Sequence, residues 1–328
     1  MLTVKETATL LKGFDNVLIL THVRPDGDTV GCAAALCAAL RTLGKTAYLL
    51  PNPGLTDTTA PFFRPYEAPE GFVPEKIVST DIATVNLLPE NAKEYAGSID
   101  LAMDHHVSFE HFAKENIVRS EAGACGELLY DILNELGCIN AETAELLYLA
   151  ISTDTGCFAY GNTTARTHAV TAALMETGID VYPINKTFFG TKSRRRMALE
   201  ADMLVNCDYF DRDRCVFLYV PMSLMERIGA TETDAEDLSS LGRQIEGVDC
   251  AVTFRELRPD VWKLSVRTDK RVNATTFVPA WGAADTPPPQ AAPWRPPLPR
   301  YGSRCLPLSA PKWRILRAEH GKRNRHHR

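Results

Sequence analysis

Short apolar runs alternate with longer periodic segments over the first 190 residues. Short runs rich in aliphatic and β-branched residues are typical of buried strands, whereas longer periodic segments that stop at glycine are typical of helices. The pattern predicts strands at 17–21, 47–50, 77–80 and 99–103, and helices at 28–43, 126–136, 141–152 and 164–177. This alternation indicates an α/β fold with a mostly parallel sheet and helices on both faces. The Pro-rich segment 51–76 lacks a period, and we expect a surface loop there.

A second pattern begins near Ser193. It predicts a connecting helix at 193–204, a helix at 234–241, and strands at 215–220, 250–256 and 261–267. These elements indicate a smaller α/β domain. We therefore expect a first domain at 1–190, a linker helix at 191–206, a second domain at 207–278 and a separate tail at 279–328.

Composition narrows the class of protein. The chain has 328 residues, of which 45% are hydrophobic and 23% charged, as in soluble globular proteins. No apolar run is long enough to span a bilayer, and the N-terminus lacks the pattern of a secretory signal. Nine cysteines without a Cys-x-x-Cys pair are typical of reduced thiols in a large chain. We therefore expect a cytoplasmic protein without a membrane partner.

Charge is distributed unevenly. The formal net charge is −5, but residues 279–328 hold ten Lys/Arg and two Asp/Glu, which leaves −13 on the preceding residues. The same tail holds ten of the 21 prolines. An acidic body argues against binding of long duplex nucleic acid, which needs an extended positive surface.

Acids and imidazoles follow the ends of several predicted strands. In an open parallel sheet, ligands bind beyond the carboxyl ends of the strands, so residues at these ends should meet at one edge. The candidates are His22, Asp26 and Asp28 in "THVRPDGD", Asp81 in "KIVSTD", Asp104, His105 and His106 in "LAMDHH", and Asp154 in "ISTDTG".

Carboxylates gathered this closely repel one another unless a cation lies between them. A mixture of carboxylates and imidazoles suits Mn²⁺ or a similar first-row ion better than Ca²⁺ or a structural zinc. The set is large enough for two ions that share a carboxylate and hold a hydroxide for attack on phosphorus. In this interpretation Pro25 stiffens the first turn, and Gly27 lets its backbone turn so that Asp26 and Asp28 face different ions.

These motifs resemble, in order and spacing, the four motifs of the DHH phosphoesterase superfamily. The finer pattern, including "DTGCFAYGNTT" and "WKLSVRT", is similar to bacterial NrnA-type bifunctional oligoribonucleases and phosphatases of 3′-phosphoadenosine 5′-phosphate (pAp). The resemblance covers roughly residues 5–276. It implies a DHH catalytic domain followed by a partial DHHA1-like substrate-binding domain.

The resemblance also implies roles for individual residues. His22 and Asp26 would hold one Mn²⁺, Asp28, His105 and Asp154 the second, and Asp81 would bridge the two Mn²⁺; Mg²⁺ or Co²⁺ are alternatives. Asp104 and His106 would be catalytic, with His106 facing the substrate phosphate or donating a proton to the leaving oxygen. Asn162 and Thr163 would line the site, and Arg267 would bind a phosphate or nucleotide.

The implied activity is Mn²⁺-dependent hydrolysis of short oligoribonucleotides or pAp, so the expected partners are short single-stranded RNA or a nucleoside bisphosphate. A homodimer is compatible with the sequence. The nearest alternative is a family II inorganic pyrophosphatase, although "RPDGD" and "FAYGNTT" fit the oligoribonuclease pattern better. Two further alternatives are a nucleotide-binding protein whose catalysis is impaired by an altered C-terminus, and a non-catalytic protein whose basic tail binds nucleic acid.

The C-terminal sequence departs from the family pattern. DHHA1 domains usually carry a Gly-Gly-Gly-His stretch where this chain has "FVPAWGAADTPPPQAAPWRPP". Permitted codons for Ala280 to Trp294, read in another frame, encode a Leu-Gly-Gly-Gly-Gly-His sequence. We therefore hypothesise a frameshift near Thr276, which predicts a disordered out-of-frame tail at 279–328, an incomplete second domain and weak activity on oligonucleotides.

Overall fold

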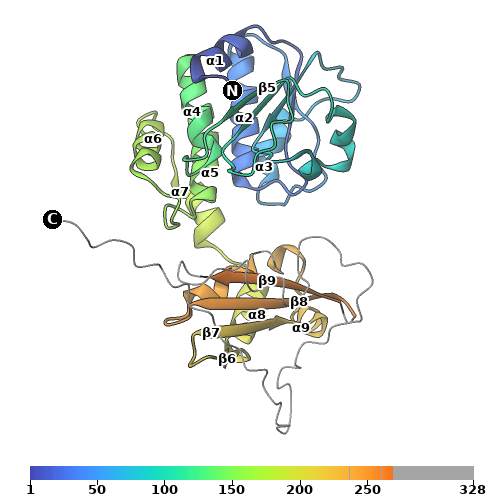
Figure 1. Ribbon diagram of the computed structural model, residues 1–328, viewed down its shortest axis with the longest axis vertical. Helices are drawn as coiled ribbons and strands as arrows, with labels where there is room; N and C mark the ends of the chain where they lie inside the picture. Colours follow the sequence, from blue (N-terminus) through green and yellow to red (C-terminus); the bar gives the residue numbers. More distant parts are fainter. Residues whose placement is uncertain (236, 260, 269–328) are drawn as a thin grey trace, which may run out of the picture. The chain divides into compact units, whose positions relative to one another are not determined.

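The computed structural model describes residues 1–235, 237–259 and 261–268. The chain divides into two compact units, one at Met1–Thr191 and one that begins at Lys192 (Figure 1). Each unit is described by itself. The predicted tail at 279–328 and the proposed break near Thr276 lie outside the described residues.

The first unit is built on a five-stranded sheet of order β2-β1-β3-β4-β5. Every neighbouring pair in this sheet is parallel. The predicted α/β fold with a parallel sheet is therefore confirmed. The strands are β1 (Val17–Leu20), β2 (Ala47–Leu49), β3 (Lys76–Thr80), β4 (Leu101–Asp104) and β5 (Glu115–Val118).

Alternate residues of β1 face two separate cores. Val17 and Ile19 pack in the larger core with the α-helices, whereas Leu18 and Leu20 pack in a smaller one. The smaller core is closed by two 3₁₀ helices, η2 (Val85–Leu87) and η3 (Glu90–Tyr95), and the loops around them, so short turns rather than long helices cover this face. The helices of the unit are α1 (Val4–Lys12), α2 (Gly27–Thr42), α3 (Ala60–Phe63), α4 (Cys125–Glu135), α5 (Ala141–Asp154), α6 (Ala165–Met175) and α7 (Tyr182–Asn185), with η1 (Arg64–Tyr66), η2 (Val85–Leu87), η3 (Glu90–Tyr95) and the π-helical η4 (Lys186–Gly190).

Small residues allow α2 and α5 to pack closely. A Cβ on Gly31 would lie 2.4 Å from the carbonyl oxygen of Leu146, and one on Gly27 would lie 2.3 Å from Oγ1 of Thr153. Gly27 is the first residue of α2 and has no positive φ, so close helix approach explains it better than the backbone freedom inferred from the sequence. This packing brings the start of α2 next to the end of α5.

Three parts of the first unit differ from the sequence-based expectation. Segment 51–76 was expected to be a surface loop, but it forms α3 and η1, and Phe63 is completely buried in the larger core. The strand β5 and the helix α1 were not predicted at all. β5 is a sheet edge with one fully buried residue, Ile117, so its sequence carries little hydrophobic alternation.

The second unit contains a four-stranded sheet of order β6-β7-β8-β9, in which β7 and β8 are parallel and the outer pairs antiparallel. Its strands are β6 (Asp208–Phe210), β7 (Cys215–Val220), β8 (Cys250–Arg258) and β9 (Val261–Thr268). Leu199 and Met203 of the predicted connecting helix, α8 (Arg194–Val205), belong to the core of this unit. A short helix, α9 (Met222–Ile228), follows β7.

The helix predicted at 234–241 was wrong. The structure instead has two 3₁₀ helices, η5 (Thr233–Ala235) and η6 (Leu238–Gln244). Asp237 between them has φ of 49°, a left-handed conformation that ends an α-helix. No helix in the described part of the chain is long and apolar enough to cross a membrane.

Candidate metal centre

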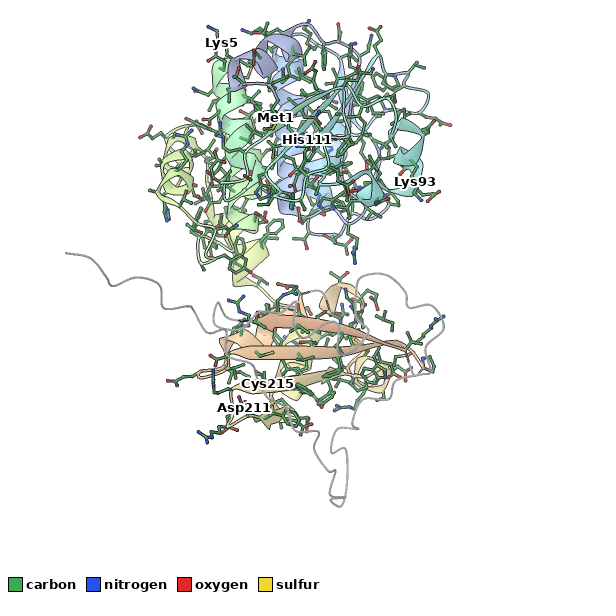
Figure 2. All side chains as sticks on the ribbon, viewed as in Figure 1. Met1, Lys5, Lys93, His111, Asp211 and Cys215 are labelled. Atoms are coloured by element: carbon green, nitrogen blue, oxygen red, sulfur yellow. The ribbon has the colours of Figure 1, made fainter. Side chains whose placement is uncertain are left out.

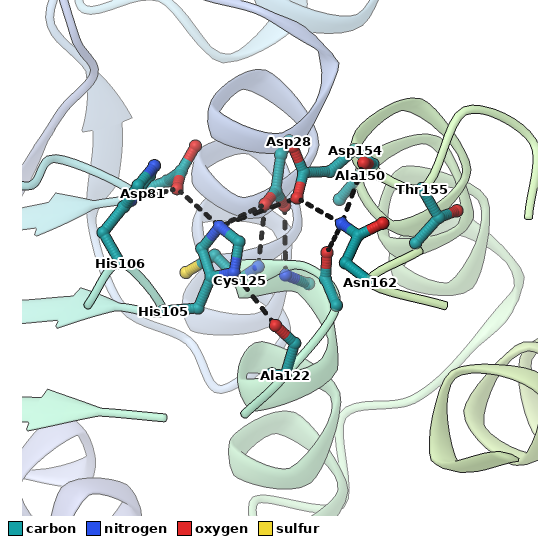
Figure 3. Close-up of polar contacts among 12 residues, drawn as sticks. Asp28, Asp81, His105, His106, Ala122, Cys125, Ala150, Asp154, Thr155 and Asn162 are labelled. Atoms are coloured by element: carbon teal, nitrogen blue, oxygen red, sulfur yellow. Dashed lines mark hydrogen bonds and ion pairs between the residues drawn. The ribbon is translucent and has the colours of Figure 1, made fainter. Parts of the chain in front are cut away.

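Four chain segments bring carboxylates and imidazoles together at the carboxyl edge of the five-stranded sheet (Figure 3). His22, Asp26 and Asp81 form one set of three possible ligands, and Asp28, His105 and Asp154 form another. Within each set, one ligand atom per residue lies within 4.8 Å of the others. A third overlapping set joins Asp81, His105 and His106. The structure thus brings together all six residues that the sequence predicted as metal ligands.

Asp26 fixes the start of α2 and faces His22. As the N-cap, its Oδ1 accepts hydrogen bonds from the backbone N–H groups of Asp28 and Thr29, both at 3.1 Å. Its side chain is 60% exposed, and Nε2 of His22 lies 3.6 Å from Oδ1. The capping bonds hold Asp26 at the rim of the cluster with oxygen lone pairs still available.

Asp28 lies beneath the rim and is almost completely buried. Its carboxylate accepts the N–H groups of Cys125 at 2.7 Å and Gly126 at 3.0 Å, and the Cys32 thiol donates at 3.2 Å. Cys125 and Gly126 are the first residues of α4, whose N-cap Ala124 supplies no side-chain bond, so Asp28 satisfies this helix end. Burial raises the pKa of Asp28 well above its ordinary value, and the charges of Asp154 and Asp26 raise it further.

His105 is oriented by a backbone carbonyl. Its Nδ1 lies 3.2 Å from the oxygen of Ala122, to which it can donate. A proton on Nδ1 leaves the lone pair of Nε2 free to bind a cation. Nε2 lies 3.7 Å from Asp28 Oδ2, 3.6 Å from Asp81 Oδ1 and 3.7 Å from Asp154 Oδ2 (Figure 3). A cation held by Nε2 would therefore be within reach of three carboxylates.

The surroundings of Asp81 show whether the cluster fits a metal ion. It follows β3 in a left-handed conformation with φ of 57°, which is uncommon for a residue other than glycine. Its Oδ1 is buried and has no hydrogen-bond partner in the described part of the chain. Burial raises the pKa of Asp81 well above its ordinary value, and Asp28 is the next cause. A buried carboxylate oxygen without a donor, beside an acceptor nitrogen, is satisfied by a divalent cation.

Asp104 holds His106 in a single orientation. Oδ1 of Asp104 lies 2.7 Å from Nδ1 of His106 and accepts the backbone N–H groups of His105 and His106 at 2.5 and 2.7 Å. This hydrogen bond raises the pKa of His106. Burial acts in the opposite direction, and the nearby negative charges raise the pKa further. The His106 side chain is 45% exposed, so its Nε2 is the ring nitrogen available to a substrate. Asp104 itself is completely buried, and its Oδ1 contacts the His106 ring.

The three predicted substrate-binding residues lie in different surroundings. The Asn162 amide donates to the carbonyl oxygens of Gly123 at 2.8 Å and Asp154 at 3.1 Å, so it connects the segment before α4 to the C-terminal end of α5. The hydroxyl of Thr163 is buried without a hydrogen-bond partner in the described residues. Arg267 is exposed on β9 in the second unit. Their contacts with a substrate remain predictions.

Backbone groups are the part of the site that the sequence did not reveal. The Ala122 carbonyl orients His105, and the first N–H groups of α4 bind Asp28. These groups belong to every residue type and leave no side-chain signal. The sequence "EAGACGE" shows small residues there, which is consistent with a close backbone approach but does not identify it.

The fold and the cluster define an α/β protein with a candidate divalent-metal centre at the carboxyl edge of its sheet. Residues 16–151 match the model of the "DHH family, N-terminal domain". The match lies within the first unit, which is therefore similar to the N-terminal domain of the DHH family.

Three known proteins are similar over most of the chain. The "Bifunctional oligoribonuclease and PAP phosphatase NrnA" of Thermus thermophilus is 29% identical, and the match covers 81% of each chain. The protein of the same name from Bacillus subtilis is 24% identical over 74% of this chain and 78% of its own. The crystal structure of an exopolyphosphatase-related protein from Bacteroides fragilis has a TM-score of 0.75 at 20% identity and covers 84% of this chain and 86% of its own. That structure supports the fold.

Proposed function

We propose that this protein hydrolyses short oligoribonucleotides and pAp, with two Mn²⁺ ions as its cofactor. The observation that carries the proposal is the pair of ligand sets at one sheet edge, with Asp81 close to both and His106 beside them. The names of the NrnA relatives from Thermus thermophilus and Bacillus subtilis support the choice of substrates.

In this proposal His22 and Asp26 would hold one ion, Asp28, His105 and Asp154 would hold the other, and Asp81 would serve both. The donor set of carboxylates and imidazoles suits Mn²⁺, with Mg²⁺ or Co²⁺ as alternatives. Two ions bound there would neutralise the substrate phosphate and supply an activated water. The protein contributes the fixed arrangement, through the α2 N-terminus at Asp26, the α4 N-terminus at Asp28 and the Ala122 carbonyl at His105.

His106 is proposed to act on the substrate rather than to bind a metal ion. Its Nδ1 is engaged by Asp104, so Nε2 faces outward with one defined orientation. From there it can contact the phosphate or donate a proton to the leaving ribose oxygen. Asp104 favours the protonated imidazole because a buried carboxylate lies against it. Asn162, Thr163 and Arg267 are proposed to bind the remainder of the substrate.

Turnover of three substrates in parallel tests the proposal. Purified protein is incubated with Mn²⁺ and pAp, with a 5′-labelled diribonucleotide, or with inorganic pyrophosphate. We expect phosphate release from pAp or cleavage of the dinucleotide, even if slow, to require Mn²⁺ and to be lost in Asp81→Asn. Faster turnover of pyrophosphate would favour the pyrophosphatase alternative, and no metal-dependent turnover of any substrate would contradict the proposal.

A further inference from the structure

Asn52 lies in the segment between β2 and α3 and is 5% exposed. Its amide nitrogen donates to the backbone oxygen of His22 at 2.8 Å and to the hydroxyl of Thr21 at 2.9 Å. Its amide oxygen accepts the N–H of Gly54 at 2.9 Å. A single buried side chain thus connects the turn that carries His22 to a segment about 30 residues later in the chain.

The backbone next to Asn52 approaches the same turn. A Cβ on Gly54 would lie 2.2 Å from the carbonyl oxygen of Val23 and 3.2 Å from Cδ of Pro25. A side chain at position 54 would therefore push the turn away. Together with the hydrogen bonds of Asn52, this approach shows that segment 52–54 is fitted closely against residues 22–25.

The other ligand set has different supports. Asp28 is held by the N-terminus of α4, His105 by the Ala122 carbonyl, and Asp154 is next to the Asn162 amide. The hydrogen bonds of Asn52 reach none of these residues. A change at Asn52 should therefore act on the His22 half of the cluster and leave the His105 half intact.

We infer that Asn52 is a positioning residue for the metal ion held by His22, Asp26 and Asp81. The inference rests on the proposed metal centre and adds a residue that acts through the backbone of His22. Loss of an outer partner of a metal ligand typically lowers metal affinity by about 10–100-fold. We expect a loss of that size for one ion and less than about a twofold change for the other.

Calorimetric titration of the whole chain with Mn²⁺ tests the inference. Asn52→Asp keeps the side-chain shape and the acceptor for Gly54 but removes the two donated hydrogen bonds, and Asn52→Ala removes all three. The matched control is Asn91→Ala. Asn91 is exposed and donates to the neighbouring Pro51 carbonyl at 2.7 Å, so its loss perturbs the same segment without touching His22.

Two single-ion backgrounds identify the affected ion. His105→Ala should leave the His22-side ion, and Asn52→Asp in that background should weaken it about 10–100-fold. His22→Ala should leave the other ion, and adding Asn52→Asp should not change its affinity. Retained binding of that ion also shows that the variant is folded. Gly54→Ala should reproduce the effect of Asn52→Asp in both backgrounds.

The outcomes separate this inference from the proposed function. If the unaltered protein binds no Mn²⁺, the metal centre itself is wrong. If it binds two ions and Asn52→Asp binds both with unchanged affinity, Asn52 does not position His22. Equal weakening of both ions, or equal weakening by Asn91→Ala, would likewise overturn the assignment.

Discussion

Replacement of Asp81 by asparagine should separate metal binding from stability. The ionised carboxylate is buried beside Asp28, and both its burial and that charge raise its pKa. A carboxyl group with a raised pKa in the folded state lowers stability at pH values above its unfolded pKa. Asparagine keeps the shape, has no charge and tolerates the left-handed conformation at this position. In EDTA we therefore expect Asp81→Asn to unfold at the same temperature as the unaltered protein or higher.

Mn²⁺ should reverse that order. At a free concentration of one hundred times the dissociation constant, each bound ion adds about 2.7 kcal/mol, so two add about 5 kcal/mol. For a unit of this size, Met1–Thr191, one kcal/mol corresponds to about 2–4 °C. The unaltered first unit should thus gain about 10–20 °C from Mn²⁺. Asp81→Asn should gain less than about 5 °C because both ions lose a carboxylate.

Differential scanning calorimetry with Mn²⁺ or EDTA measures both effects, because no tryptophan precedes residue 262 to report on the first unit by fluorescence. Asp100→Asn is the matched control. Asp100 directly precedes β4, at the end of the strand away from the cluster. Its carboxylate accepts hydrogen bonds from the N–H of Ile77 at 3.0 Å and the Lys114 ammonium at 2.9 Å. These bonds outweigh burial and lower its pKa, so its loss should destabilise the protein but preserve the Mn²⁺ shift. A full Mn²⁺ shift in Asp81→Asn would refute the reasoning.

Two further predictions have defined outcomes. His105→Ala should lower Mn²⁺ content measured by elemental analysis, whereas His106→Ala should keep both ions and lower turnover by about 10²–10⁴-fold; equal metal loss in both would reject this division of roles. Asp234→Asn should reduce the stability of the second unit by about 2 kcal/mol at neutral pH, because Asp234 accepts hydrogen bonds from Ser193, Arg195 and Thr231. Urea unfolding followed by Trp262 fluorescence measures this loss. Burial alone would raise the pKa of Asp234, but these hydrogen bonds hold it well below its usual range. The difference in stability between the two proteins should therefore persist above about pH 4 and shrink as the pH falls further. A stability difference independent of pH would contradict this.

The sequence predicted the parts of the fold in which hydrophobic pattern and burial agree. β1 is apolar at every position and buried on both faces, and α2 is stopped by a glycine, so both were predicted nearly to their ends. β5 and α3 were missed because tertiary contacts decide them. Glu115 in β5 is exposed, and α3 has four residues whose Phe63 fits a core formed by distant segments.

The sequence predicted the candidate metal ligands of the site but not the residues that position them. Carboxylates and imidazoles at strand ends have a clear spacing, and the structure brings the predicted ligands together. Asn52 could not be found in this way, because an asparagine in a Pro-rich segment usually indicates a turn. Its contact with His22 depends on the pairing of β1 with β2, which no local pattern shows.

The central claim is that residues from four segments form a two-ion centre, and anomalous X-ray diffraction from crystals grown with Mn²⁺ tests it most directly. The account predicts two peaks in the anomalous difference map about 3.5–4 Å apart. One should contact His22 and Asp26, the other Asp28, His105 and Asp154, and both should contact Asp81. A map with no peak at this edge of the sheet, or with Mn²⁺ bound elsewhere while these carboxylates contact no metal, would contradict the account.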